Sequence, residues 1–176
     1  MHKMKKNILF TGRPGVGKTT VIMKLISGVE GVDGFYTEEI REKGERKGFR
    51  IVTLRGKKGI LAHKDLHSSY RVGKYGVNIE DLENIAGRSI TLALSDDKKK
   101  IVLIDEIGRM ELYSPKFQEA VVKALDSPKR VIATIQDKHN RFTDAIRKRE
   151  DVELIEVTSE NRKRLPGELR DKVLES

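Results

Sequence analysis

The amino-acid sequence predicts an α/β fold: a doubly wound, mainly parallel sheet flanked by helices, with an antiparallel hairpin extension. Three observations predict it. Short, near-continuous apolar runs alternate with helical patterns, a glycine-rich loop follows the first run, and two acids follow a later one. Such runs are typical of parallel strands covered by helices on both faces, and strands joined by helices imply right-handed crossovers. We therefore expect a ligand at the carboxyl ends of the strands.

The apolar runs predict strands at 7–11, 101–104, 130–135 and 154–158. A helix should follow the first strand and end near Gly28, since apolar residues recur along one of its faces. Asn78 can cap a second helix at about 79–95. Ser114 and Pro115 are typical of the N-cap and first residue of a third helix, and apolar residues follow them at helical spacing.

Residues 35–63 break this alternation. Three β-rich runs, at 35–41, 49–54 and 60–62, are separated by turns rich in glycine and lysine. Such a pattern predicts two successive hairpins, whose antiparallel strands extend the sheet. No repeat, low-complexity tract or Pro/Ser linker marks a boundary, and 176 residues suit one domain spanning 1–176.

A phosphate-binding loop is predicted directly after the first strand. The motif G-x-x-x-x-G-K-[ST] is filled by Gly12, Gly17, Lys18 and Thr19. Backbone N–H groups can wrap a polyphosphate only where side chains are small and unusual dihedral angles are allowed, which glycine provides. The nucleotide-binding residues predicted from this loop are Gly12, Arg13, Pro14, Gly15, Val16, Gly17, Lys18, Thr19 and Thr20.

The motif also assigns roles within the loop. The ammonium of Lys18 should reach the β/γ oxygens, while the helix that starts there directs its positive end at the phosphates. Thr19 should place its hydroxyl on Mg²⁺. Arg13 is a candidate for a phosphate contact, with a solvated loop arginine as the equal alternative.

Two adjacent acids follow the apolar run 101–104. A buried strand that ends in an acid delivers a carboxylate to the edge of the sheet where the ligand binds. Asp105 is predicted to hold Mg²⁺ together with Thr19, in the role of a Walker B aspartate. Glu106 is predicted to orient the water that attacks the γ-phosphate, or to accept its proton. Lys18, Asp105 and Glu106 are thus the predicted catalytic residues.

Composition limits the other function classes. Cysteine is absent, which excludes disulfides and cysteine zinc sites. No apolar run suits a secretory signal or a membrane span, so we expect a cytoplasmic protein. The chain has 36 Lys and Arg against 27 Asp and Glu, but the signs are interspersed and aromatic residues make up only 5%. A nucleic-acid partner is therefore compatible with the charge but not favoured over an ion-paired surface of the heat-adapted kind. A monomer is the default expectation.

The chain resembles the thermophile-type nucleoside-triphosphatases, a family that includes the human cancer-related nucleoside-triphosphatase. The similarity rests on the phosphate loop, on Gly-Phe-Tyr-Thr-Glu-Glu-Ile-Arg at 34–41 and on Asp-Glu-Ile-Gly-Arg-Met-Glu-Leu at 105–112. Shorter matches are Gly48-Phe49, Tyr75-Gly-Val-Asn78, Ala133-Thr-Ile135 and Glu160-Asn-Arg162. The loop is common to all phosphate-loop proteins, whereas the second and third stretches together are specific to this group.

This resemblance implies a Mg²⁺-dependent hydrolase that cleaves the γ-phosphate of ATP, GTP and other nucleoside triphosphates with little base selectivity. It also implies an additional strand between the loop strand and the Walker B strand, for which 130–135 is the candidate. Thr134 at the end of that run is a candidate γ-phosphate sensor.

Other site assignments remain open. Arg109 and Glu111 follow the acid pair, where they could brace the γ-phosphate or form a surface ion pair. Asn161 and Arg162 are expected to begin the last helix, where a base or ribose could rest.

Two further function classes are compatible with the motifs. A phosphotransferase would hold an acceptor near 35–63 and could recruit Arg141, Arg147 and Arg149 for a lid. A nucleic-acid-coupled motor or a regulatory switch would use the same loop. Asp105-x-x-Gly108 matches the D-x-x-G pattern of switches, but no guanine-reading segment follows it, which argues against a dedicated GTP switch.

Overall fold

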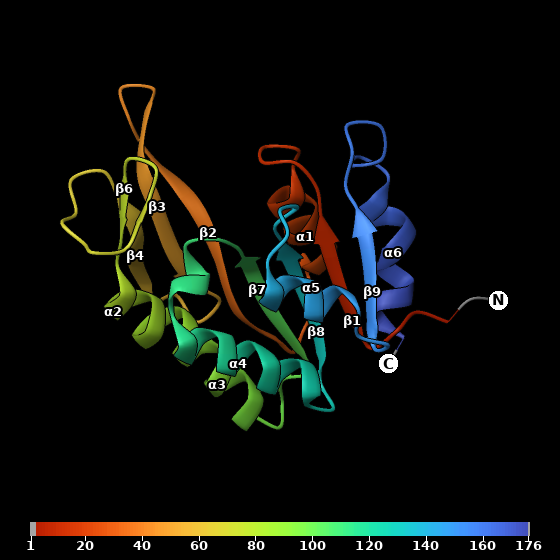
Figure 1. The fold of residues 1–176 in the computed structure, drawn as a ribbon. Coiled ribbons are helices and arrows are strands. Elements are labelled where there is room, and N and C mark those ends of the chain that lie inside the picture. Colours follow the sequence, from red (N-terminus) through yellow and green to blue (C-terminus); the bar gives the residue numbers. More distant parts are fainter. Residues whose placement is uncertain (1–2, 176) are drawn as a thin grey trace.

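A mixed sheet runs across the whole width of the molecule (Figure 1). The computed structural model describes residues 3–175. These residues form nine strands in the order β5-β6-β4-β3-β2-β7-β8-β1-β9. The strands are β1 (Asn7–Thr11), β2 (Val32–Glu42), β3 (Glu45–Thr53), β4 (Lys58–His63), β5 (Arg71–Val72), β6 (Tyr75–Val77), β7 (Ile101–Ile107), β8 (Arg130–Ile135) and β9 (Val152–Glu156).

Helical segments lie in four of the eight connections between consecutive strands, and one helix follows the last strand. They are α1 (Lys18–Ile26), α2 (Ile79–Asp81), the π-helical η1 (Leu82–Gly87), α3 (Arg88–Ser95), the 3₁₀ helix η2 (Glu111–Tyr113), α4 (Pro115–Asp126), α5 (Arg141–Arg147) and α6 (Leu165–Leu174). The predicted helix at 79–95 exists, but it contains a π-helical segment between α2 and α3. In the part of the chain that the structure describes, no helix has the length and apolar character needed to cross a membrane.

The parallel half of the sheet confirms the predicted fold class. Strands β2, β7, β8, β1 and β9 are parallel neighbours in that order. The strand at 130–135 lies between the loop strand β1 and the acid-bearing strand β7, as the resemblance implied. All five strands end at the same edge of the sheet, which is the upper edge in Figure 1.

Alternate residues of the parallel strands pack on opposite faces. Ile8 and Phe10 join a core with α1 and α6, whereas Leu9 joins a second core with α3 and α4. All three side chains are fully buried. Helices on both faces therefore explain why these strands are near-continuous apolar runs in the sequence.

The antiparallel half confirms the predicted hairpins at 35–63. Strand β2 pairs with β7 through residues 32–35, and its residues 35–42 pair with β3. Strands β4 and β6 extend the sheet further. The short β5–β6 ribbon was not predicted, because two- and three-residue strands are too short to show an alternating pattern.

Two boundaries near the carboxyl terminus differ from the prediction. Strand β9 spans 152–156, not 154–158, because its only partner is β1, whose five residues set its length. Helix α6 begins at Leu165, so the expectation that Asn161 and Arg162 begin the last helix is wrong. Asn161 instead closes a turn with Thr158: each residue's side-chain oxygen accepts the other's backbone N–H. Pro166 then marks the first turn of α6, as is common at helix starts.

Candidate active site

The glycine-rich loop connects β1 to α1 at the carboxyl edge of the sheet (Figure 1). Gly12 has φ +152° and Gly17 has φ +111°, conformations that other residues rarely adopt. A Cβ atom on Gly12 would lie 2.7 Å from the carbonyl oxygen of Val157, because the loop passes close to the segment after β9. Both glycines of the predicted motif are thus required by the backbone itself.

The first turn of α1 is free of competing side chains. Its N-cap residue, Gly17, has no side chain that could accept from the helix N–H groups, and the first turn contains no acidic residue. Its backbone N–H groups therefore remain available to an external acceptor, and the partial positive charge of the helix end favours an anion. Arg13, Pro14 and Gly15 at the tip of the loop are exposed, as is Thr20.

Lys18 links the loop to the acidic residues of β7. Its Nζ atom donates to the carbonyl oxygen of Gly12 at 2.8 Å and lies 3.1 Å from Oε2 of Glu106. The lysine side chain is 10% exposed, whereas that of Glu106 is 32% exposed and can reach solvent. A positive and a negative group therefore face the same space in front of α1.

Asp105 lies at the centre of a buried hydrogen-bond network. Thr19 Oγ1 donates to its Oδ2 at 2.9 Å, and Thr134 Oγ1 donates to its Oδ1 at 2.6 Å. Burial raises the pKa of Asp105 to about 6, although the two threonine hydroxyls and the backbone N–H of Thr37 act in the opposite direction. The carboxylate is thus held by three elements besides its own strand.

A second buried acid adjoins this network. Glu111 in η2 is 4% exposed, so the alternative of a surface ion pair is wrong for this residue. A Cβ atom on Gly108 would lie 2.7 Å from Oε1 of Glu106 and 3.2 Å from Oε2 of Glu111, which places both carboxyl groups against this glycine. Burial, and then the neighbouring charge of Glu106, raise the pKa of Glu111 well above its usual value.

Three candidate residues lie at the margin of the site. Arg109 is exposed. Arg162 lies against the loop: its Nη1 donates to the carbonyl oxygen of Val16 at 3.1 Å. The amide of Asn161 is used within its own turn, since its oxygen accepts from Thr158 and its nitrogen donates to the carbonyl oxygen of Glu156.

Sequence reasoning gave no role to two features of the site. The N–H of Thr37 reaches Asp105 because β2 continues beyond its pairing with β7. The sequence contained one signal for it, the stretch at 34–41 that carried the family resemblance. The pairing of Lys18 with Glu106 joins residues 88 positions apart, and no local pattern predicts such a contact.

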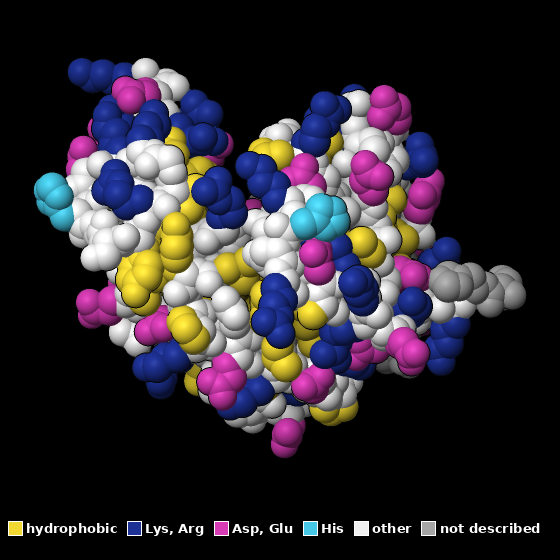
Figure 2. All heavy atoms as spheres, in the orientation of Figure 1, with side chains coloured by type: hydrophobic (Ala, Val, Ile, Leu, Met, Phe, Trp, Pro, Cys, Tyr) yellow, Lys and Arg dark blue, Asp and Glu magenta, His cyan; other side chains and the backbone are white. Residues whose placement is uncertain are grey.

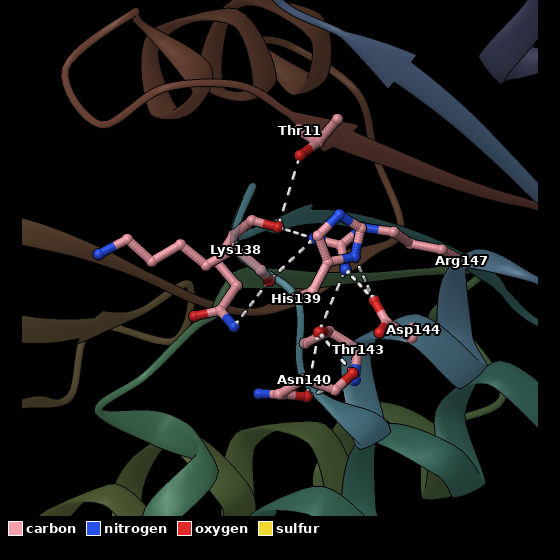
Figure 3. Close-up of polar contacts among 8 residues, drawn as sticks. Thr11, Lys138, His139, Asn140, Thr143, Asp144 and Arg147 are labelled. Carbon is pink, nitrogen blue, oxygen red and sulfur yellow. Dashed lines mark hydrogen bonds and ion pairs between the residues drawn. The ribbon is translucent and has the colours of Figure 1, made fainter.

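Two of the three arginines proposed for a lid, Arg147 and Arg149, are held by other contacts. Arg147 in α5 donates to the carbonyl oxygen of Gln136 and contacts Thr143 and Asp144, which fixes the loop after β8 (Figure 3). Arg149 pairs with Asp126 and Asp151, both at 2.8 Å. Asp126 ends α4 shortly before β8, and Asp151 directly precedes β9, so both lie where these strands begin. Arg149 is therefore held at the edge of the sheet opposite the site, and a lid role for it is wrong.

Comparisons with known proteins agree with this geometry. Residues 7–170 match a family model described as NTPase. The chain is 52% identical over 162 residues to the nucleoside-triphosphatase THEP1 of Thermotoga maritima, with 92% of each protein covered. It is 41% identical to the human cancer-related nucleoside-triphosphatase over 178 residues, covering 92% of this chain and 93% of the human protein.

A solved structure has the same fold. The crystal structure of THEP1 from the hyperthermophile Aquifex aeolicus superposes with a TM-score of 0.84 at 38% identity, covering 97% of this chain and 99% of that one. The family model and the relatives each extend over nearly the whole chain. The chain therefore belongs to the NTPase family that contains the THEP1 and cancer-related nucleoside-triphosphatases.

Proposed function

We propose that the chain hydrolyses the γ-phosphate of ATP, GTP and other nucleoside triphosphates to give a nucleoside diphosphate and phosphate, with Mg²⁺ and little base selectivity. The observation that carries the proposal is the convergence of two contacts in front of α1. Lys18 meets Glu106 at 3.1 Å, and Thr19 meets Asp105 at 2.9 Å. A cation, two oxygen donors and a solvent-accessible carboxylate thus surround the uncapped end of a helix.

Binding begins with the loop. Its backbone N–H groups and those at the start of α1 donate hydrogen bonds to the phosphate oxygens, and Lys18 adds a full positive charge. A phosphate oxygen that reaches Lys18 competes with Glu106 for the ammonium. The triphosphate therefore separates the catalytic carboxylate from its lysine and leaves it free to bind water.

Thr19 and Asp105 fit a magnesium site. Both present oxygen atoms, the donor type that Mg²⁺ prefers, and Thr134 fixes the second oxygen of Asp105. When bound, Mg²⁺ neutralises the charge that develops on the phosphate oxygens. The buried hydroxyls keep the carboxylate aimed at this position.

Glu106 performs the proton step. Its carboxylate orients a water molecule toward the γ-phosphorus and accepts a proton as the new P–O bond forms. The bond to the β–γ bridging oxygen breaks, and Lys18 with the loop N–H groups stabilises the charge that moves onto that oxygen. Glu111 lies behind Glu106 and restricts the space in which its side chain can turn.

The turn after β9 supports broad base specificity. We assign Arg162 to the margin of the base or ribose, because it crosses the loop at Val16. Both side-chain atoms of Asn161 are used locally, so its amide has little capacity left to distinguish one base from another. We retain Thr134 as the γ-phosphate sensor, acting through its bond to Asp105.

Phosphate release and nucleotide binding, measured separately, test the proposal. Phosphate release from ATP, GTP, CTP and UTP should require Mg²⁺ and no added acceptor. Glu106→Gln should retain a fluorescent non-cleavable analogue while its turnover falls by about 10²-fold or more. Lys18→Ala should lose both binding and turnover. Lys24→Ala, at an exposed position of the same helix, is the matched control and should resemble the native protein.

The same measurements separate hydrolysis from phosphotransfer. Normal turnover by Glu106→Gln would show that another group positions the water. Phosphate release that appears only with an added acceptor would favour a kinase. The structure favours hydrolysis, because Arg147 is fixed within its loop and Arg149 lies at the opposite edge of the sheet.

A further inference from the structure

Basic side chains gather on one lobe of the molecule. The lobe, residues 38–76, comprises the outer part of β2 and strands β3 to β6, and Lys and Arg side chains cover its upper part in Figure 2. It contains eleven Lys and Arg against five Asp and Glu, so it carries +6 of the chain's net charge of +9. The signs are interspersed along the sequence, but this one segment holds most of the excess positive charge.

Arg71 and Lys74 are among the cations of the lobe that have no carboxylate partner. Three acids of the β2–β3 hairpin pair with the arginines and lysines around them. Arg71 instead donates to the carbonyl oxygens of Leu66 and Lys74, and the ammonium of Lys74 lies 5.6 Å from the ring centroid of Tyr75. Within residues 3–175, neither forms an ion pair. Both can therefore neutralise an external anion without losing an internal one.

An exposed aromatic pair adjoins these cations. Tyr70 is 45% exposed and Tyr113 is 38% exposed, and their ring centroids are 5.2 Å apart. Among the described residues, no other tyrosine or phenylalanine side chain is as exposed as these two. The hydroxyl of Tyr113 donates to the carbonyl oxygen of Arg71 at 2.7 Å, which fixes the pair against the basic loop. Two hydrophobic rings are thus presented to solvent beside positive charge.

Arg71 also lines a hollow in the surface. It has a volume of about 400 Å³ and is lined by Lys64, Asp65, Leu66, His67 and Arg71. Arg71 therefore belongs to the lining of this hollow and also contacts Tyr113 of the tyrosine pair. Charges that suit phosphates thus adjoin rings that suit bases.

We propose that this lobe binds single-stranded nucleic acid, with bases on Tyr70 and Tyr113 and phosphates against Arg71 and Lys74. Single strands combine an anionic backbone with unstacked bases, and proteins bind them with basic grooves and exposed aromatic rings. A duplex keeps its bases stacked, so the tyrosines would contribute nothing to its binding. An anionic membrane or an acidic protein would use the charges without requiring flat rings.

The test measures binding directly. A labelled single strand of about 16 nucleotides, with hydroxyl groups at both ends, is titrated with the full chain and followed by fluorescence anisotropy. Arg71→Glu with Lys74→Glu should weaken binding at least about tenfold and reduce the salt dependence of the binding constant. Tyr70→Ala should weaken it about tenfold with the salt dependence unchanged. Lys116→Glu with Lys123→Glu in α4 changes the net charge equally and should have little effect.

Each alternative has its own signature. No binding at low salt, or equal loss in the α4 control, would overturn the proposal. Equal affinity for a duplex, with no effect of Tyr70→Ala, would overturn it in favour of simple charge attraction. Binding to phosphatidylserine vesicles but not to the oligonucleotide would assign the surface to a membrane. Lys18→Ala should bind the strand with the affinity of the native protein. The binding test can therefore be interpreted even if the proposed hydrolysis is wrong.

Discussion

Glu111 is the residue at which burial and charge conflict most strongly. It is 4% exposed, and Glu106 and Asp105 lie in its surroundings. Its pKa rises because water is excluded and because these neighbours carry the same charge when ionised. Lys18 pairs with Glu106 and so offsets part of that charge. Glu111 therefore retains its proton to a higher pH than an exposed glutamate does.

This raised pKa predicts a pH-dependent stability. The unfolded side chain titrates near 4.5, and the folded one above it. The folded state binds the extra proton between these two pKa values, so this contribution to stability is complete below the unfolded pKa and is lost as the pH rises through the folded one. Glu111→Gln should therefore raise the melting temperature at pH 8 more than at pH 4.

Thermal unfolding in chelator, measured from pH 4 to 8, checks this prediction. Glu119→Gln on the exposed face of α4 is the control, because that side chain is 68% exposed and should leave the pH profile unchanged. If Glu111→Gln shifts the melting temperature equally at both ends of the range, Glu111 does not titrate as argued.

The residues of the site differ in how far a sequence can predict them. Gly12, Lys18 and Thr19 lie within eight positions, and their roles follow from one loop and one helix turn. Asp105 was predicted because it follows a buried apolar run, although β7 continues past it to Ile107. The burial of Glu111 depends on how η2 folds back over Gly108, a tertiary contact that spacing alone does not encode. Local geometry was therefore predictable and packing around it was not.

At the scale of elements, the close pairing of β2 with β7 positions the site. Gly34 has φ +126°, and a Cβ atom there would lie 2.1 Å from the carbonyl oxygen of Leu103. This close approach explains the glycine that opens the stretch at 34–41. It also brings Thr37 to Asp105, since β2 continues from this point past the end of its pairing with β7.

Gly34→Ala should destabilise the protein by about 2 to 4 kcal/mol, because the added methyl group must displace the backbone of β7. Gly44→Ala separates the cost of backbone strain from the cost of the steric clash. Gly44 has φ +79° but open space around its Cβ position, so strain alone should cost about 1 kcal/mol. Urea unfolding of both variants measures the difference. Equal losses would mean that the contact with Leu103 relaxes without cost.

Elements with complete local signals were predicted well. Helix α4 begins where Ser114 and Pro115 indicated, and the Ser114 hydroxyl accepts the N–H of Phe117 at 3.0 Å. Strand β9 was displaced by two residues because its length depends on β1 and not on its own apolar residues. The first and last residues of edge strands and of two-residue ribbons are set by the strands that pair with them. The local sequence therefore does not predict where these elements begin and end.

At the scale of the whole molecule, the site joins segments that are far apart in the chain. The loop and α1 provide one side, the end of β7 a second, and the turn after β9 a third. The Asp105 carboxylate connects β7 to both α1 and β8, and Glu106 adds a second link from β7 to α1. A ligand that binds across these segments stabilises the native state as a whole, because the unfolded chain does not assemble them.

A non-cleavable triphosphate with Mg²⁺ should therefore raise the melting temperature. At about 100 times its dissociation constant, the ligand adds about 2.7 kcal/mol, which corresponds to a shift of about 5 to 10 °C for a chain of this size. Chelation of Mg²⁺ should remove most of the shift, and so should Asp105→Asn, which preserves the shape of the side chain but weakens its hold on a cation. Glu106→Gln should retain at least the full shift, since Glu106 orients water and its neutral amide no longer competes with the phosphates for Lys18. A shift that survives both chelation and Asp105→Asn would show that the phosphates are held by the loop alone and would remove Asp105 from the metal site.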